Sequence, residues 1–196
     1  MEQKSLVKVA VTNRRLCESS LGEQIARLAN EKIHRPDLLI LREKDLPENE
    51  YEALAREVLS LCEDLNLRCI LHTYVETARR LRVDGIHLPF SLWRKHLEEL
   101  SDFSFLGVSV HSVEEARFAQ EHGVSYLTAG HIFATDCKKG APPRGLNFLK
   151  EVCESVYVPV YAIGGITPQR IPEIVQGCPS IAGVCMMSYY MKLSIR

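Results

Sequence analysis

The sequence predicts an α/β protein, a compact (β/α)8 TIM barrel in which residues 1–196 form a single domain. Eight short apolar or β-branched runs recur along the chain, and most of them are separated by a segment with helical periodicity. Division of 196 residues among eight units leaves about 24 residues for each, near the lower size limit of this fold. A doubly wound open sheet is the alternative, and periodicity by itself does not exclude it.

The predicted strands are continuous apolar runs rather than alternating ones. Continuous runs are typical of parallel strands, because such strands are buried on both faces of the sheet. The runs are residues 6–12, 37–43, 68–72, 85–89, 105–111, 126–131, 158–165 and 181–188. No G-x-G-x-x-G motif follows the first run, where the dinucleotide site of an open sheet would need it, and this favours the barrel.

The intervening segments carry helical periodicity and helix-start signals. Apolar residues recur three and four positions apart, which gives each predicted helix one apolar face. Ser112 and Glu115 have the spacing of a capping box, and Thr167 is an expected N-cap followed by a proline. The clearest predicted helices are residues 21–33, 50–65, 112–123 and 167–177.

Composition excludes several classes of protein. Lys and Arg total 24 against 25 Asp and Glu, so the net charge of -1 provides no overall attraction to nucleic acid. The mean hydropathy is -0.07, and no apolar run approaches the roughly 20 residues that span a bilayer. Seven cysteines without a C-x-x-C spacing argue against a disulfide framework or a structural zinc site. We expect a cytoplasmic protein with no nucleic-acid or membrane partner.

In a barrel of this kind the reactive groups lie at the carboxyl ends of the strands. Read in chain order, these ends supply Arg42–Glu43–Lys44, His72, His87, Ser109 with His111, Gly130–His131, Gly164–Gly165 and Met187–Ser188. Loops after the seventh and eighth strands of such barrels commonly bind phosphate through backbone N–H groups, which the Gly164–Gly165 pair would let approach closely. The alternative interpretation of this pair is a tight strand-to-helix turn.

His131 is the strongest catalytic candidate by position. It follows a predicted strand and precedes a long loop, residues 131–145, that contains several basic side chains. An imidazole can remove and return a proton near neutral pH. The alternative is a structural histidine bonded within the loop. His87 and His111 are expected to pack or to cap, and Cys137 has no evident neighbouring base, which favours a spectator role.

Residues 41–44, 107–116, 130–146 and 162–169 resemble the thiamine phosphate synthase superfamily, and GHIFATDCKKGAPPRG is most similar to its thiazole tautomerase (TenI) branch. The resemblance implies a TIM barrel. In the synthases, an Asn-Asp pair after strand three and an acidic residue after strand four help to bind a pyrimidine diphosphate and Mg²⁺. Here the matching positions are His72–Thr73 and residues 90–92, which offer no carboxylate. Synthases usually have Gly-Pro where this chain has Gly130–His131.

The resemblance therefore implies a metal-independent tautomerase without a cofactor. Its substrate would be a small carboxylated dihydrothiazole phosphate, aromatised by proton transfer through His131. The phosphate would bind at Gly165, Met187 and Ser188. In the synthases the residues at the positions of Arg42 and Lys44 would serve the diphosphate, and our own hypothesis is that one of these cations receives the substrate carboxylate here. The alternative is a relic or an ion pair with Glu43. The remaining expected substrate contacts are Ser109, Thr135, Asp136, Cys137 and Lys138.

Two other functions stay open at this point. One is a thiamine phosphate synthase, and the other is a non-catalytic barrel that senses a thiazole phosphate. We also expect a shortened eighth helix, because few residues follow Ser188. A short helix would leave apolar surface uncovered, which predicts a homo-oligomer with the tail or the uncovered groove at or near the contact. The tail side chains that suit such an interface are Tyr189, Tyr190, Met191 and Leu193. The alternative is a tail that folds back over its own barrel.

Overall fold

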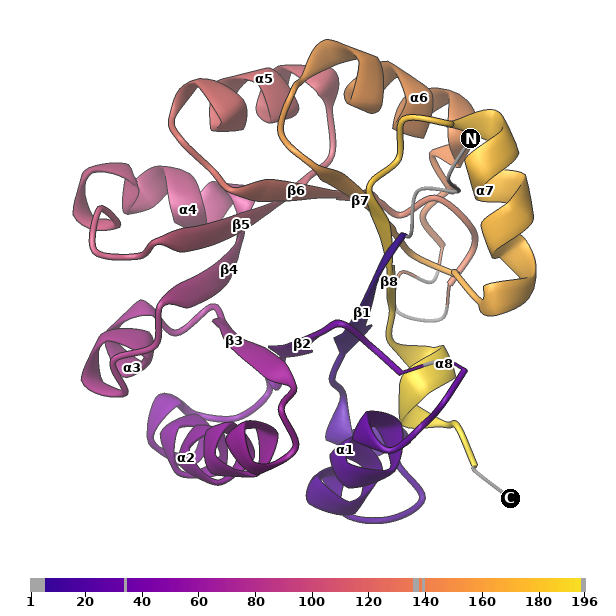
Figure 1. The fold of residues 1–196 in the computed structure, drawn as a ribbon. Helices are drawn as coiled ribbons and strands as arrows, with labels where there is room; N and C mark the ends of the chain where they lie inside the picture. The colour runs from indigo at the N-terminus through magenta and orange to yellow at the C-terminus, as the bar shows by residue number, and fades with distance from the viewer. Residues whose placement is uncertain (1–5, 34, 136–137, 139, 195–196) are drawn as a thin grey trace.

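The computed structural model describes residues 6–33, 35–135, 138 and 140–194. Eight parallel strands close into a barrel in chain order, and the first pairs with the last (Figure 1). The predicted TIM barrel is confirmed, and the open sheet is wrong. The strands are β1 (Val7–Val11), β2 (Leu38–Leu41), β3 (Arg68–His72), β4 (Gly85–Pro89), β5 (Phe105–Val110), β6 (Tyr126–Gly130), β7 (Val160–Ile163) and β8 (Gly183–Met186).

Helices form the outer ring of the barrel (Figure 1). They are α1 (Leu21–Ala29), α2 (Glu48–Asp64), α3 (Val75–Arg80), α4 (Phe90–Lys95), α5 (Val113–Glu121), α6 (Gly145–Ser155), α7 (Ile171–Gly177) and α8 (Ser188–Met191), with short 3-10 turns at Arg14–Leu16, Leu97–Glu99 and Pro168–Arg170. Within the described ranges, no helix combines the length and apolar character that a bilayer crossing requires.

The predicted helix starts differ in detail from the structure. The Ser112 side chain accepts a hydrogen bond from the backbone N–H of Glu115, as predicted. The Glu115 carboxylate, however, accepts from the N–H of His111 and not from that of Ser112. Thr167 stands at the predicted N-cap position, but its side chain makes no capping bond and the chain opens with a 3-10 turn before α7.

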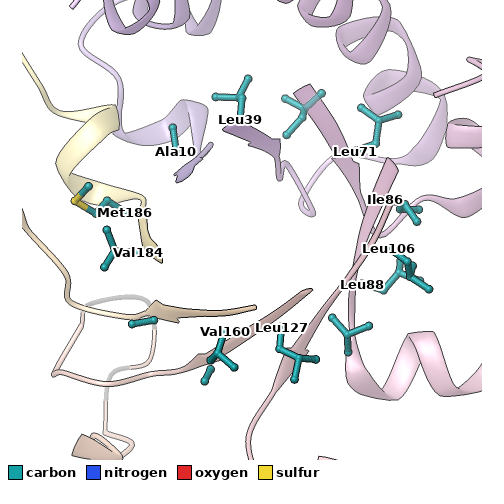
Figure 2. Packing of buried hydrophobic residues seen from close by; sticks show 14 of the residues in the cluster. Ala10, Leu39, Leu71, Ile86, Leu88, Leu106, Leu127, Val160, Val184 and Met186 are labelled. Atoms are coloured by element: carbon teal, nitrogen blue, oxygen red, sulfur yellow. The ribbon is translucent and has the colours of Figure 1, made fainter. Parts of the chain in front are cut away.

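Successive residues of each strand face two different cores. Ala10, Leu39, Leu71 and Val184 point outward under the helices, as Figure 2 shows. The alternate residues fill the barrel interior: Val9, Val11, Leu38, Ile40, Ile70, Tyr126, Tyr161 and Cys185. Burial on both faces explains why the strands read as continuous apolar runs.

One glycine makes room for a large interior side chain. The ring of Tyr126 on β6 leans over the neighbouring strand β5 and occupies the space that a Cβ on Gly107 would need. Any larger residue at Gly107 would collide with the phenol ring. The Tyr126 ring is thereby stacked between Phe105 and Tyr161, with centroid distances of 5.1 Å and 5.0 Å.

The short α8 is confirmed, and it packs on its own chain beside α1 (Figure 1). The buried amide of Gln24 donates to the carbonyl oxygens of Tyr190 and Leu193 at 2.7 Å and 3.0 Å. Tyr190 and Met191 are completely buried within the chain. The expectation that these two side chains form a subunit contact is therefore wrong, because their apolar surface is already covered. Homo-oligomerisation itself stays a prediction.

Candidate functional site

A cavity of about 450 Å³ opens at the carboxyl ends of the strands. The fold brings together nine of the eleven residues predicted for the site, and all nine line this cavity: Arg42, Lys44, Ser109, His131, Thr135, Lys138, Gly165, Met187 and Ser188. Asp136 and Cys137, the other two, lie outside the described residues. Their assigned roles stay predictions.

The structure adds lining residues that sequence reasoning did not assign to substrate. Three of them are His72, Thr73 and His111. The sequence places these residues at the carboxyl ends of strands, and this position by itself could have marked them as lining residues. Cys185 lies inside β8 and reaches the cavity from below. Nothing in an apolar run distinguishes an interior residue that borders a ligand cavity from its neighbours, so Cys185 had no sequence signal.

His131 is held at the cavity wall by the backbone that follows β6. Ile132 N–H donates to the Ile163 carbonyl at 2.9 Å, and Phe133 N–H donates to the Gly164 carbonyl at 3.0 Å, so the chain continues alongside β7. His131 is 7% exposed, and Nε2 of its ring lies 3.3 Å from the carbonyl oxygen of Ala141.

The Gly164–Gly165 pair allows this close approach. Gly164 and Gly165 have φ values of +103° and +65°, a region that favours glycine. A Cβ on Gly164 would collide with the Cβ of His131, and one on Gly165 would lie 2.5 Å from the carbonyl oxygen of Ala134. The pair therefore positions the His131 segment in addition to forming the turn after β7.

Two buried histidines lie at the base of the cavity, and one of them, His72, belongs to its lining. The rings of His72 and His87 are stacked with centroids 5.5 Å apart. Burial, together with the positive charge of Arg42, lowers the pKa of His87 to about 3. Burial and the neighbouring His87 and Arg42 also hold the pKa of His72 well below its ordinary value. Both rings are therefore neutral at physiological pH.

Glu43, between the two predicted cations after β2, pairs with Arg14 and is not among the described residues that line the cavity. Its buried carboxylate accepts hydrogen bonds from the backbone N–H of Arg14 at 3.0 Å and from the Arg14 guanidinium at 3.0 Å. This pair ties the loop after β1 to the loop after β2. Arg42 and Lys44, on either side of Glu43, line the cavity.

Lys138 reaches the opposite wall of the cavity. Its ammonium lies 3.1 Å from Nε2 of His111, and both side chains line the cavity. Because an ammonium group only donates hydrogen bonds, Nε2 of His111 is the acceptor in this contact. The predicted basic loop thus places a cation against the end of β5.

The described lining of the cavity is basic. It contains Arg42, Lys44, Lys138 and three histidines, and no Asp or Glu is among the described lining residues. A cavity with this charge suits an anionic ligand. Mg²⁺ requires hard oxygen ligands, chiefly carboxylates. Across the part of the chain that the structure describes, no cluster of three His, Cys, Asp or Glu residues is arranged to hold a metal.

Comparison with known proteins identifies the family. The TMP-TENI family model, described as thiamine monophosphate synthase, matches residues 8–189. The chain belongs to this family. A putative thiamine-phosphate synthase 2 of Aquifex aeolicus is 33% identical over 90% of this chain and 95% of its own length. A thiamine-phosphate synthase of Clostridium tetani is 31% identical over 85% of this chain and 80% of its own length.

Solved structures agree with this membership of the thiamine monophosphate synthase family. A thiamine phosphate pyrophosphorylase from Pyrococcus furiosus superposes with a TM-score of 0.80 at 26% identity, covering 97% of this chain and 90% of its own. A 3-hexulose-6-phosphate synthase, at 12% identity and a TM-score of 0.62, shares the fold alone. The relatives from Aquifex aeolicus and Clostridium tetani are both named as thiamine-phosphate synthases, which favours the synthase alternative over the tautomerase branch that the sequence motif predicts.

Proposed function

We propose that this member of the thiamine monophosphate synthase family is a thiazole tautomerase, which aromatises a carboxylated dihydrothiazole phosphate by metal-independent proton transfer. The observation that supports this function best is the placement of His131. The imidazole stands in the wall of a cavity whose described lining is rich in cations and contains no carboxylate. This set of groups suits an anionic substrate and a proton-transfer reaction.

The contact with Ala141 selects the basic nitrogen of His131. A carbonyl oxygen only accepts hydrogen bonds, so Nε2 carries the hydrogen in this contact, and Nδ1 holds the lone pair of the neutral ring. In the proposed step, Nδ1 takes the proton from ring C2 of the substrate and returns a proton to the exocyclic carbon. The C2–H bond breaks, a C–H bond forms at the exocyclic carbon, and the histidine ends as it began.

The two ends of the cavity would bind the two anionic groups of the substrate. The phosphate would lie at Gly165, Met187 and Ser188, where the chain turns after β7 and at the start of α8. The carboxylate would pair with Arg42 or Lys44 on the β2 side. Thr135 lines the wall between them, and Asp136 and Cys137 complete the same loop in the sequence.

Incubation of the purified protein with the dihydrothiazole tautomer tests this function directly. We expect an increase in the absorbance of the aromatic carboxythiazole phosphate in buffer that contains EDTA. Tight binding of the aromatic product without any turnover would identify a non-catalytic thiazole-phosphate sensor and would contradict the proposal.

Thiamine phosphate synthase is the second candidate, favoured by the names of the curated relatives. The measurement that separates the two is coupling of pyrimidine diphosphate to thiazole phosphate with and without Mg²⁺. Because the positions that supply carboxylates in the synthases hold His72–Thr73 and residues 90–92, we expect no Mg²⁺-dependent coupling. Coupling by the unmodified protein would replace the tautomerase assignment.

A further inference from the structure

Four side chains form a hydrogen-bonded network in the floor of the cavity, which we call the floor network: His87 on β4, Ser109 on β5, and Tyr126 and Thr128 on β6. Nδ1 of His87 lies 2.8 Å from the Tyr126 hydroxyl, and Nε2 lies 2.7 Å from the Ser109 hydroxyl. The Thr128 hydroxyl donates to the Ser109 hydroxyl at 2.9 Å. Ser109 is the member that lines the cavity.

The hydrogen positions of the floor network follow from counting donors and acceptors. Neutral His87 has one N–H donor and one acceptor nitrogen. The Tyr126 hydroxyl is completely buried and needs an acceptor for its hydrogen, and Nδ1 of His87 faces it. If Nδ1 carried the hydrogen instead, the phenol would be left with a buried donor without an acceptor in this network, which is strongly unfavourable. Nε2 of His87 therefore carries the hydrogen and donates to Ser109.

Ser109 then has only its hydroxyl hydrogen left for a further hydrogen bond. A hydroxyl group has two lone pairs and one hydrogen. His87 and Thr128 both donate to the Ser109 oxygen, so both lone pairs are occupied. The hydroxyl hydrogen remains available for an acceptor atom in the cavity that Ser109 lines.

We propose that His87 and Tyr126 are positioning residues that fix Ser109 as a hydrogen-bond donor toward the ligand. The cavity then selects a ligand that presents an acceptor atom at this point and discriminates against one that presents a donor, because two donors facing each other leave both unpaired. The ligand identity rests on the proposed function, in which the carboxylate and the ring nitrogen of the thiazole are both acceptors.

The tautomer of His87 tests the hydrogen positions without any ligand. In protein labelled with ¹⁵N-histidine, long-range ¹H–¹⁵N correlation distinguishes a protonated from an unprotonated ring nitrogen, and the His87→Gln variant assigns the signals. We expect the Nε2–H tautomer in the wild-type protein. In Tyr126→Phe the preference disappears, because the donor to Nδ1 is gone, and the Nδ1–H form gains population. An Nδ1–H tautomer in the wild-type protein would overturn the proposal.

Kinetics of the tautomerase reaction test the consequence for the ligand. Tyr126→Phe is expected to raise KM about three- to tenfold with kcat unchanged, since a hydrogen bond made equally in ground and transition states is weakened. Tyr161→Phe is the matched control, because Tyr161 stacks on Tyr126 in the same barrel interior and lies outside the floor network. Equal KM values for the two variants would contradict the proposal.

A double-mutant cycle shows whether Tyr126 acts through Ser109. In the Ser109→Ala background, Tyr126→Phe should have no further effect on KM. Additive effects would show that the phenol acts by another route and would overturn the proposal. If the wild-type protein shows no turnover, the proposed function fails, while the His87 tautomer still decides the hydrogen positions of the floor network.

Discussion

The chemistry proposed at His131 depends on one side chain and is tested by one substitution. In His131→Gln the amide keeps the hydrogen bond to the Ala141 carbonyl but cannot exchange a proton near neutral pH. We expect kcat for tautomerisation to fall by about 10² or more, with an unchanged melting temperature. His122→Gln, at an exposed position after α5, serves as the control. Turnover at the wild-type rate in His131→Gln would remove the assignment.

A second residue-scale prediction concerns the cation beside β2. If Arg42 pairs with the substrate carboxylate, Arg42→Met should raise KM about ten- to a hundredfold for the carboxylated substrate. An analogue without the carboxylate should be turned over by Arg42→Met and wild type with similar KM values. Arg56→Met, on α2, controls for loss of a surface guanidinium. An unchanged KM for the carboxylated substrate would show that Arg42 has another role.

At the scale of the element, α8 is short but essential to the barrel. Tyr190 and Met191 are fully buried, and truncation of such side chains typically costs about 2–5 kcal/mol each. Deletion of residues 189–196 would remove both, a loss comparable to the roughly 5–15 kcal/mol total stability of a domain. We expect the deleted protein to be unfolded by circular dichroism. A folded, soluble monomer would contradict this prediction.

Gln24→Ala tests the same element with a smaller change. The substitution removes the amide group that donates to the carbonyl oxygens of Tyr190 and Leu193 and should lower the unfolding free energy by about 1–3 kcal/mol. Lys192→Ala, at an exposed position after α8, is the matched control and should change stability little. The measurement is urea denaturation, and equal midpoints for the two variants would argue against the docking role of Gln24.

For the whole molecule, the two buried histidines make stability depend on pH. The pKa of His87 is lowered to about 3 and that of His72 also lies far below normal, so the unfolded chain binds protons that the folded protein does not. Stability is fully present above the unfolded value of about 6.5 and falls as pH decreases toward the folded pKa. Each histidine contributes about 1.4 kcal/mol per pH unit.

Urea denaturation from about pH 6 to about pH 5 measures this slope. Unfolding of the wild-type protein should be accompanied by the uptake of about two protons over this interval, and unfolding of His87→Gln by the uptake of about one. The unfolding free energy should fall with decreasing pH in the same proportion. A wild-type unfolding free energy that does not change over this interval would show that the two rings are not held neutral by the fold.

The sequence by itself determined the barrel and the general location of the site. Eight continuous apolar runs predict parallel strands, and the carboxyl ends of such strands meet at one mouth. His131, Gly165 and Ser188 could therefore be placed together from the sequence, although they follow three different strands. The apolar pattern shows which segments are buried strands, and the direction of each strand shows which of its ends lies at the mouth of the barrel. Both properties can be recognised from local sequence.

Only the tertiary structure decided which side chains meet inside the barrel. His87 and Tyr126 are 39 residues apart in the sequence, and Gln24 and Tyr190 are 166 apart. Both contacts depend on strand register and helix docking, which no local pattern encodes. A buried polar side chain looks the same in sequence whether it packs, caps or positions a neighbour. Its function is set by the partners that the closed barrel brings within hydrogen-bond distance.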